Sequence, residues 1–239
     1  SGKYVGRYNT ISGHYSKTGA APLVNLTRAS ARSGARGKGS KWSEYDFASW
    51  CAVWLLYLVE FSDWDSQSKI GRGYVDSNSS AISSGGTDSM TYHTGRAAGT
   101  NGKTAVQYRH IENPYGNVFE FIDGINFSDG TVYVCLNPAS YADDTATNYT
   151  NIGSKIQSDG YITAIGVAAA MPWAFFPTGV GGSETTYIPD FAYCNSGWRV
   201  LRVGGSWSNG GNAGLFYFNA NGASSNTFSG VGARLLFHP

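Results

Sequence analysis

The sequence of 239 residues predicts an α+β fold with long irregular loops. One segment carries apolar residues at helical spacing, and several shorter segments are rich in β-branched and aromatic residues. The 32 glycines and the aromatic content of 15% are typical of a turn-rich globular protein and not of a disordered one. A chain of this length forms one large domain or two small ones, and it can build a core without disulfides.

The N-terminal part combines a short predicted strand with a basic segment. Tyr4 to Tyr8 alternates aromatic or aliphatic residues with small or basic ones, as a strand does. Residues 28–41 then carry five Lys or Arg and no acid. A nucleic-acid-binding patch needs such charges beside stacking aromatics, and none lies between Tyr15 and Trp42. We therefore interpret residues 28–41 as a solvated loop and expect no nucleic-acid partner.

An amphipathic helix is predicted from about Ser43 to Glu60. Ser43 has the character of an N-cap, and the acids that follow it suit the first turn of a helix. The apolar residues at helical spacing are Phe47, Trp50, Cys51, Trp54, Leu55 and Leu58. An aromatic stripe of this kind usually faces the core, so we expect Trp50 and Trp54 to be buried against an antiparallel sheet.

The middle of the chain offers two weak catalytic signals. Gly71-Arg72-Gly73 and Gly85-Gly86 punctuate a Ser-, Gly- and Thr-rich run from Ser77 to Thr104, which we expect to be loop. A lone Gly-x-Gly with no strand before it and no helix after it does not indicate a nucleotide site. Residues 118–121 predict a core strand that carries Glu120, with Asp123 just beyond. Alternation along a strand points these two carboxylates to opposite faces, which favours structural roles over paired acid/base catalysis.

Further strands and loops follow. The Asp, Asn, Thr and Ser side chains of residues 141–160 offer oxygen ligands for Ca²⁺ but lack an ordered metal-binding pattern, and no metal is predicted. The predicted elements are a strand at Thr131–Leu136, a loop at Tyr141–Gly160, a strand at Tyr161–Ala170, a loop at Pro172–Gly182 and a short edge segment at Thr185–Ile188.

Cysteine, histidine and hydropathy patterns exclude several classes. Three distant cysteines, Cys51, Cys135 and Cys194, are interpreted as mostly buried thiols, with a single disulfide as the alternative. The four histidines have no ligand spacing. The longest apolar stretch, residues 162–176, is too short to span a bilayer, so we expect no membrane insertion. No signal peptide opens the chain, and Ser1-Gly2 fits a tag remnant or a cut from a longer protein.

The last forty residues form a distinct segment. Between Arg202 and Arg234 there is no charged residue, no Pro and no Cys, only Gly, Ser, Asn, Thr and Ala with apolar and aromatic islands. The islands argue against a flexible linker, which is the usual interpretation of such a composition. The order Arg-x-Gly-Gly-x-Trp-x-x-Gly-x-x-Ala-Gly-Leu-Phe spans residues 202–216, and Gly-x-Arg follows at residues 232–234.

This order resembles the variable C-terminus of proteins that retroelements diversify in phages and bacteria. These proteins are built on the formylglycine-generating-enzyme subtype of the C-type lectin fold. Residues 116–121, Gly-Asn-Val-Phe-Glu-Phe, are similar to the Gly-Asn-Val-Trp-Glu-Trp signature of that fold, with Phe in place of both Trp. The resemblance implies one C-type lectin-like domain over residues 1–239, with a variable ligand-binding region at about 202–234. It also implies that Tyr4–Tyr8 pairs with Leu235–Phe237.

In that family, altered adenines in Asn codons give the variable positions, and such codons cannot become Lys, Glu, Gln, Met or Trp. None of these five types occurs from Ser208 to Val231. The resemblance assigns framework roles to Trp207, Gly210, Gly214, Leu215 and Arg234. It implies that the solvent-exposed, clustered ligand-binding residues are Ser206, Ser208, Asn209, Gly211, Tyr217, Asn219, Asn221, Gly222, Phe228, Ser229 and Gly230, with Tyr217 and Phe228 as the aromatic anchors.

The implied function is recognition of a protein or glycan ligand on a cell surface, by a phage tail or from a bacterial surface. One alternative is an invariant tail or pilus module of the same fold. Another is an oxidase of the formylglycine-generating type, but that chemistry uses a cysteine pair near the C-terminal end, where this chain has only Cys194. We therefore expect a non-enzymatic protein with no catalytic residue, metal or cofactor. The sequence does not fix its oligomeric state.

Overall fold

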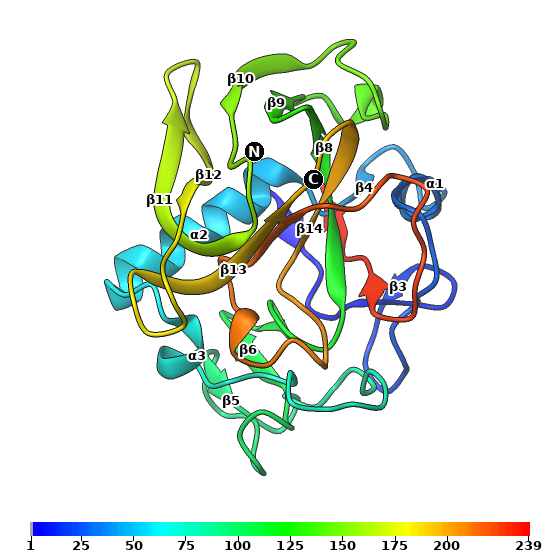
Figure 1. The fold of residues 1–239 in the computed structure, drawn as a ribbon. Coiled ribbons are helices and arrows are strands. Elements are labelled where there is room, and N and C mark those ends of the chain that lie inside the picture. Colours follow the sequence, from blue (N-terminus) through cyan, green and yellow to red (C-terminus); the bar gives the residue numbers. More distant parts are fainter. Residues whose placement is uncertain (1) are drawn as a thin grey trace.

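The computed structural model describes residues 2–239 and confirms a mixed α+β fold that is mostly sheet (Figure 1). The helical elements are α1 (Arg28–Arg36), α2 (Phe47–Phe61) and α3 (Ser66–Lys69), with short 3-10 turns η1 (Pro138–Ser140) and η2 (Gly210–Asn212). Within the described residues no helix is both long and apolar enough to cross a membrane.

The central sheet has nine strands and curls into a nearly closed barrel-like shape. Its strands are β8 (Phe119–Ser128), β9 (Thr131–Val134), β10 (Thr150–Ser154), β11 (Gly160–Ala168), β12 (Met171–Val180), β13 (Ile188–Cys194), β14 (Trp198–Val203), β15 (Phe218–Ala220) and β16 (Val231–Gly232). The order across the sheet is β10-β9-β8-β14-β15-β13-β11-β12, and β16 pairs with β8. The two edges approach each other where Ile156, just after β10, donates its N–H to the Pro177 carbonyl of β12 at 3.1 Å.

Three small sheets surround the central one. They contain β1 (Tyr4–Val5), β4 (Trp42–Glu44) and β17 (Leu235–Phe237); β2 (Thr10–Ile11) and β3 (Tyr15–Ser16); and β5 (Gly95–Arg96), β6 (Val106–Tyr108) and β7 (Ile111–Glu112). In the first sheet Tyr4 lies opposite Phe237, so the two ends of the chain pair as expected. Figure 1 shows both ends on the same side of the molecule.

Helix α2 forms where the apolar spacing predicts it, but its first turn is different. Asp46, not Ser43, is the N-cap, and its Oδ1 accepts the Ser49 N–H at 2.8 Å. Ser43 instead belongs to strand β4, which pairs with β17. Trp50 and Trp54 are fully buried, as predicted, and α2 packs on β8 and β12. The Trp54 indole N–H donates to the Leu215 carbonyl at 3.0 Å, which ties the helix to the C-terminal segment.

The prediction of a solvated loop at residues 28–41 is wrong. Residues 28–36 form helix α1, and the i, i+4 spacing places Arg28 and Arg32 on the same buried face. Arg32 Nε lies 2.6 Å from Asp123 Oδ2, and Arg28 Nε lies 2.7 Å from Asp143 Oδ1. Burial raises the pKa of Asp143, but these two arginines outweigh it and leave the pKa below its usual value. The basic residues of α1 therefore neutralise carboxylates inside the molecule.

Two predicted loops contain strands. Residues 150–154 form β10, inside the segment expected to be loop up to residue 160. Residues 171–180 form β12 although this segment includes Pro172 and Pro177. Strand β12 lies at an edge of the sheet, where a proline breaks no ladder on its free side. The mostly irregular course of residues 71–104 and the strand at 131–134 agree with the predictions.

Glu120 and Asp123 have separate structural partners, as predicted. Arg234 is fully buried, and its Nε donates to both carboxylate oxygens of Glu120, at 2.9 and 3.1 Å. Its other nitrogens donate to backbone carbonyls, including those of Gly6 and Glu112 at 2.8 and 2.7 Å. Arg234 is therefore a framework residue that joins the N-terminal segment to β8. All three cysteines are free thiols, so the single-disulfide alternative is not realised.

The double glycine after β14 has a steric cause. Gly204 and Gly205 both have positive φ, at 83° and 79°. A Cβ on Gly204 would lie 3.1 Å from Cα of Tyr115, and one on Gly205 would lie 2.7 Å from Cβ of Ala213. Only glycine adopts a positive φ at low cost and also leaves out the Cβ for which there is no space. The turn sends the chain out of the sheet and toward the candidate site.

Candidate functional site

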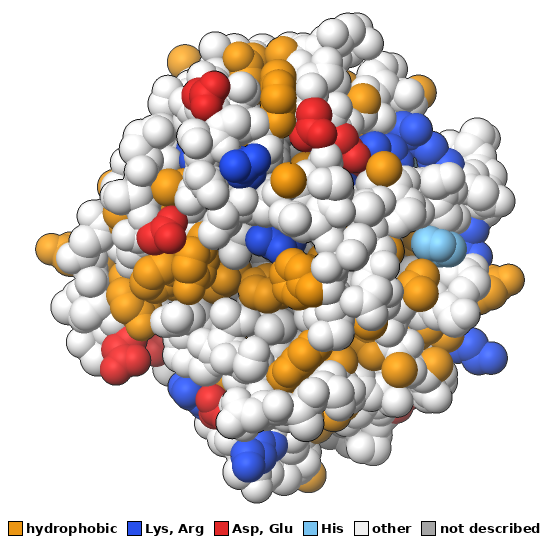
Figure 2. All heavy atoms as spheres, turned by 45° about the vertical axis from the view of Figure 1, so that its right-hand side comes forward, with side chains coloured by type: hydrophobic (Ala, Val, Ile, Leu, Met, Phe, Trp, Pro, Cys, Tyr) orange, Lys and Arg blue, Asp and Glu red, His pale blue; other side chains and the backbone are white. Residues whose placement is uncertain are grey.

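The outer side of the central sheet carries a continuous row of aromatic side chains, here named the aromatic row. Neighbouring ring centroids along it are 4.6 to 6.1 Å apart. In spatial order its members are Tyr161, Phe191, Tyr193, Tyr217, Phe119 and Phe228. Figure 2 shows a band of hydrophobic side chains crossing the middle of the molecule, with a few Lys, Arg, Asp and Glu side chains beside it.

Strand alternation explains the exposed part of the row. Along β13, Ile188, Asp190 and Ala192 point inward and are buried, whereas Phe191 and Tyr193 are half-buried on the opposite face. The sequence analysis missed these two rings. The alternation of residues 190–193 was a usable signal, because an aromatic residue at every second position predicts one aromatic face.

Tyr217 was expected to be an exposed anchor, and this is wrong: it is 1% exposed and lies in the floor of the row. The cause is the buried Asp190, whose Oδ2 accepts the Phe216 N–H at 2.6 Å and fixes the preceding turn. A Cβ on Gly214 would lie 2.1 Å from Asp190 Oδ1, so the chain passes directly over this carboxylate. The turn places Phe216 in the main core and Tyr217 against Phe119 and Tyr193.

Four other predicted binding residues are also buried. Asn219 lies in β15 between β13 and β14. Gly222 lies over Arg202, because a Cβ there would be 2.7 Å from the guanidinium carbon. The carbonyl of Gly230 accepts the Phe119 N–H at 2.8 Å as β16 begins. Ser206 turns inward, and its Oγ donates to Asn209 Oδ1 at 2.8 Å. The expectation of exposure is therefore wrong for these four positions too.

The remaining six predicted positions reach solvent. They lie in two stretches of chain, namely Ser208, Asn209 and Gly211 around η2, and Asn221, Phe228 and Ser229 in the loop of residues 221–230. Tyr161, at one end of the row, donates its hydroxyl to Asn212 Oδ1 at 2.7 Å, which attaches the first group. Phe228 is 38% exposed and closes the other end. The aromatic row thus connects two groups that the sequence predicted to form a single cluster.

One further framework prediction, for Trp207, is wrong. Leu215 and Gly214 are buried, as expected. Trp207 was expected to be core, but its side chain is half-exposed and lies against Gly230. It still fixes the backbone, because its N–H donates to the Asn117 carbonyl at 3.1 Å and its carbonyl accepts the Ser77 N–H at 2.7 Å.

Arg202 lies beneath the Phe228 end of the row and is 7% exposed. Its Nη2 donates to Asn219 Oδ1 at 2.9 Å. The guanidinium carbon lies 5.0 Å from the Phe228 ring centroid and 5.7 Å from that of Phe119. Burial lowers the pKa of this arginine.

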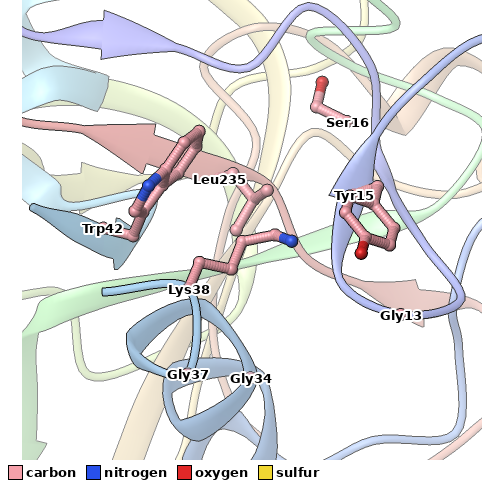
Figure 3. A pocket seen from close by; sticks show the side chains of 8 residues that line it. All are labelled: Gly13, Tyr15, Ser16, Gly34, Gly37, Lys38, Trp42 and Leu235. Carbon is pink, nitrogen blue, oxygen red and sulfur yellow. The ribbon is translucent and has the colours of Figure 1, made fainter. Parts of the chain in front are cut away.

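A hollow of about 610 Å³ lies elsewhere, between α1, β3 and the β4–β17 pair (Figure 3). Its lining residues are Gly13, Tyr15, Ser16, Gly34, Gly37, Lys38, Trp42 and Leu235. The Lys38 ammonium extends across it and sits 3.6 Å from the Tyr15 ring centroid, in a cation–π contact. None of the predicted binding residues lines this hollow.

Within residues 2–239 no three His, Cys, Asp or Glu side chains gather in a way that could hold a metal ion. Burial raises the pKa of the Cys194 thiol, so it is not activated as a thiolate. No protein-family model matches the chain, and no curated protein matches it. Function must therefore be argued from the geometry of the outer face.

Proposed function

We propose that this chain is a ligand-binding protein of the retroelement-diversified type, whose outer face recognises a protein or glycan on a cell surface. The observation that carries the proposal is the aromatic row, whose half-exposed rings are bordered by Ser, Asn and Gly at both ends. Tyr and Phe offer rigid contact area at low entropic cost, while Ser and Asn offer adaptable hydrogen bonds. This is the chemistry of a recognition surface and not of a catalytic centre.

We assign the fold to the formylglycine-generating-enzyme subtype of C-type lectins. Three features support this assignment: the pairing of β1 with β17, the steric need for Gly204 and Gly205, and the buried Arg234–Glu120 pair. All three involve residues of the motifs that carry the resemblance or the terminal pairing that it implies. A phage tail or a bacterial surface would display several copies, and multivalent display lets a weak single site suffice.

A second candidate is an invariant tail or pilus module of the same fold. The burial of five of the eleven positions assigned as variable favours it, because a buried position tolerates few substitutions.

Sequencing the gene and its neighbours separates the two candidates. Diversification predicts a reverse transcriptase gene, a near-identical repeat of the segment coding for residues 202–234, and substitutions among related copies at the six solvent-exposed positions. If the repeat is missing and these positions do not vary, the chain is an invariant module.

Binding is tested on an array of glycans and cell-surface proteins. We expect Phe228→Ser to abolish or strongly weaken retention of the ligand, because interface energy concentrates in a few aromatic residues. Tyr92→Ser is the matched control, since Tyr92 is a 78% exposed aromatic in the 71–104 segment. Equal loss of ligand retention in both variants, or no loss in either, would argue against the outer face as the binding site.

We also propose that the protein has no cysteine-oxidising activity. Copper loading should give no oxygen-dependent turnover of cysteine peptides. Turnover that disappears in Cys194→Ser would reverse this proposal.

A further inference from the structure

Arg202 differs from the other buried arginines of the molecule. Arg28, Arg32 and Arg234 each form an ion pair with a buried or half-buried carboxylate. Arg202 is buried to a similar degree, yet it takes part in none of the ion pairs of residues 2–239. A cation withdrawn from water without a partner is strongly unfavourable, so this arrangement requires a physical reason.

The contacts of Arg202 inside the protein use only part of its hydrogen-bonding capacity. A guanidinium has five N–H donors, and the one hydrogen bond of this side chain goes from Nη2 to Asn219. Nε is buried and has no partner in the described structure. The faces of Phe119 and Phe228 attract the cation, but they accept no conventional hydrogen bond. Within the described residues the guanidinium therefore keeps unused donors at Nε and Nη1.

Two residues of the 221–230 loop cover Arg202. Gly222 lies directly over the guanidinium with its backbone, since any Cβ there would clash with it. Phe228 is the most exposed member of the aromatic row and belongs to the 221–230 loop. Asn221, half-exposed, is held by Asn195 Nδ2 at 3.2 Å and adds an amide beside the site. An incoming group would meet a cation, the Asn221 amide and an aromatic face.

We propose that Arg202 binds the carboxylate of an acidic sugar, with the sugar ring lying on the aromatic side chains beside it. A guanidinium fork matches a carboxylate in geometry and charge. The half-buried Asn221 amide suits a ring hydroxyl. An acidic peptide fits less well, because β14 is paired on both edges, with β8 and β15, and offers no free backbone for strand addition.

This inference rests on the proposed ligand-binding function and names the ligand class of the same face. The probe is glucuronate, tested against glucose, acetate and sodium sulfate at matched ionic strength, with binding followed by NMR titration and melting temperature. We expect glucuronate to bind with a dissociation constant in the millimolar range and to raise the melting temperature, whereas glucose does neither. Tighter binding of an acidic peptide than of glucuronate would overturn the sugar assignment.

Two substitutions test the role of Arg202. Arg202→Gln should weaken glucuronate binding at least tenfold, whereas Arg199→Gln, three residues earlier in β14, should leave it unchanged. Asn219→Asp tests ligand binding in a protein whose Arg202 is neutralised from within. It places a carboxylate oxygen at the position that already accepts a hydrogen bond from Arg202. We expect this variant to melt at a higher temperature than the parent and to lose glucuronate binding. Asn148→Asp is the control, because Asn148 is exposed and lies outside the aromatic row.

A lower melting temperature for Asn219→Asp, or full glucuronate binding by it, would overturn the inference.

The two proposals fail in different ways. If the array finds a ligand that glucuronate does not displace, the binding function stands and the Arg202 inference fails. If glucuronate binds through Arg202 while the locus lacks a template repeat, the Arg202 site stands and diversification fails.

Discussion

Residues 213–220 and 221–229 are adjacent and both uncharged, but the first segment is buried and the second lies at the surface. Every residue from 213 to 220 is buried, including three aromatic rings. From 221 to 229 all but Gly222 reach solvent, Phe228 among them. The first segment has fixed partners, namely the Asp190 carboxylate and the neighbouring strands β13 and β14. The second has few, such as the Ser224 hydroxyl that donates to Asp144 Oδ2 at 2.5 Å.

Local composition already favours this difference. Residues 213–220 hold Leu215 and three aromatic rings, whereas residues 221–229 are mostly Ser, Asn, Gly and Thr with one ring. The fold reinforces the difference, because a buried acceptor and two strand edges bind the backbone of the first segment and its aromatic side chains are buried with it. The polar segment that follows remains at the surface.

The largest expected effect is at Tyr217. Tyr217→Ser removes a fully buried ring and should lower the free energy of unfolding by about 3–5 kcal/mol. Denaturant unfolding followed by tryptophan fluorescence measures this. Tyr193→Ser, at a half-buried ring of the same row, should cost clearly less. A Tyr217→Ser protein as stable as the parent would mean that residues 213–220 are not core.

A middle effect is expected at Trp207. Because its indole is half-exposed, Trp207→Ala should cost about 1–2 kcal/mol, less than the 3–5 kcal/mol of a buried Trp. Trp54→Ala is the comparison, since that indole is fully buried and hydrogen-bonded. Melting curves of the two variants should separate by several degrees. Equal losses would place Trp207 in the core after all.

Phe228→Ser should change the free energy of unfolding by no more than about 1 kcal/mol. The ring is 38% exposed, and its main contacts are Phe119 and Arg202. Thermal unfolding without ligand measures the change. A loss of unfolding free energy as large as that of Tyr217→Ser would show that the two segments do not differ in burial.

The smallest effect is expected at Ser208, which is exposed just before η2. Ser208→Tyr adds a ring that no neighbour needs to accommodate, so stability should stay within about 0.5 kcal/mol of the parent. The substitution should nevertheless alter the binding profile on the array. Unfolding of this variant would contradict the surface assignment of η2.

Several parts of the fold were predictable because local physics determined them. The stripe of apolar residues on α2 needs no tertiary information, and Trp50 and Trp54 are buried as expected. The pairing of β1 with β17 followed from the family resemblance and not from the residues alone. The separate roles of Glu120 and Asp123 followed from strand alternation.

Other parts depend on partners far along the chain. The arginines of α1 resemble a solvated basic run until Asp123 and Asp143 are brought beside them. Strand β12 contains two prolines, and only its place at a sheet edge makes it possible. Of the candidate site, the six exposed positions could be anticipated. The burial of Tyr217 could not, because Asp190 lies 27 positions earlier and its role appears only in three dimensions.

The loop of residues 221–230 begins at β15 and ends at β16, and both strands belong to the central sheet. Its ends are therefore held at a fixed separation whatever lies between them. The entropy of closing a flexible loop grows only with the logarithm of its length, so doubling the loop would cost about 0.6 kcal/mol. The protein can thus change the size of this surface by insertion as well as its chemistry by substitution, without altering the fold that carries it.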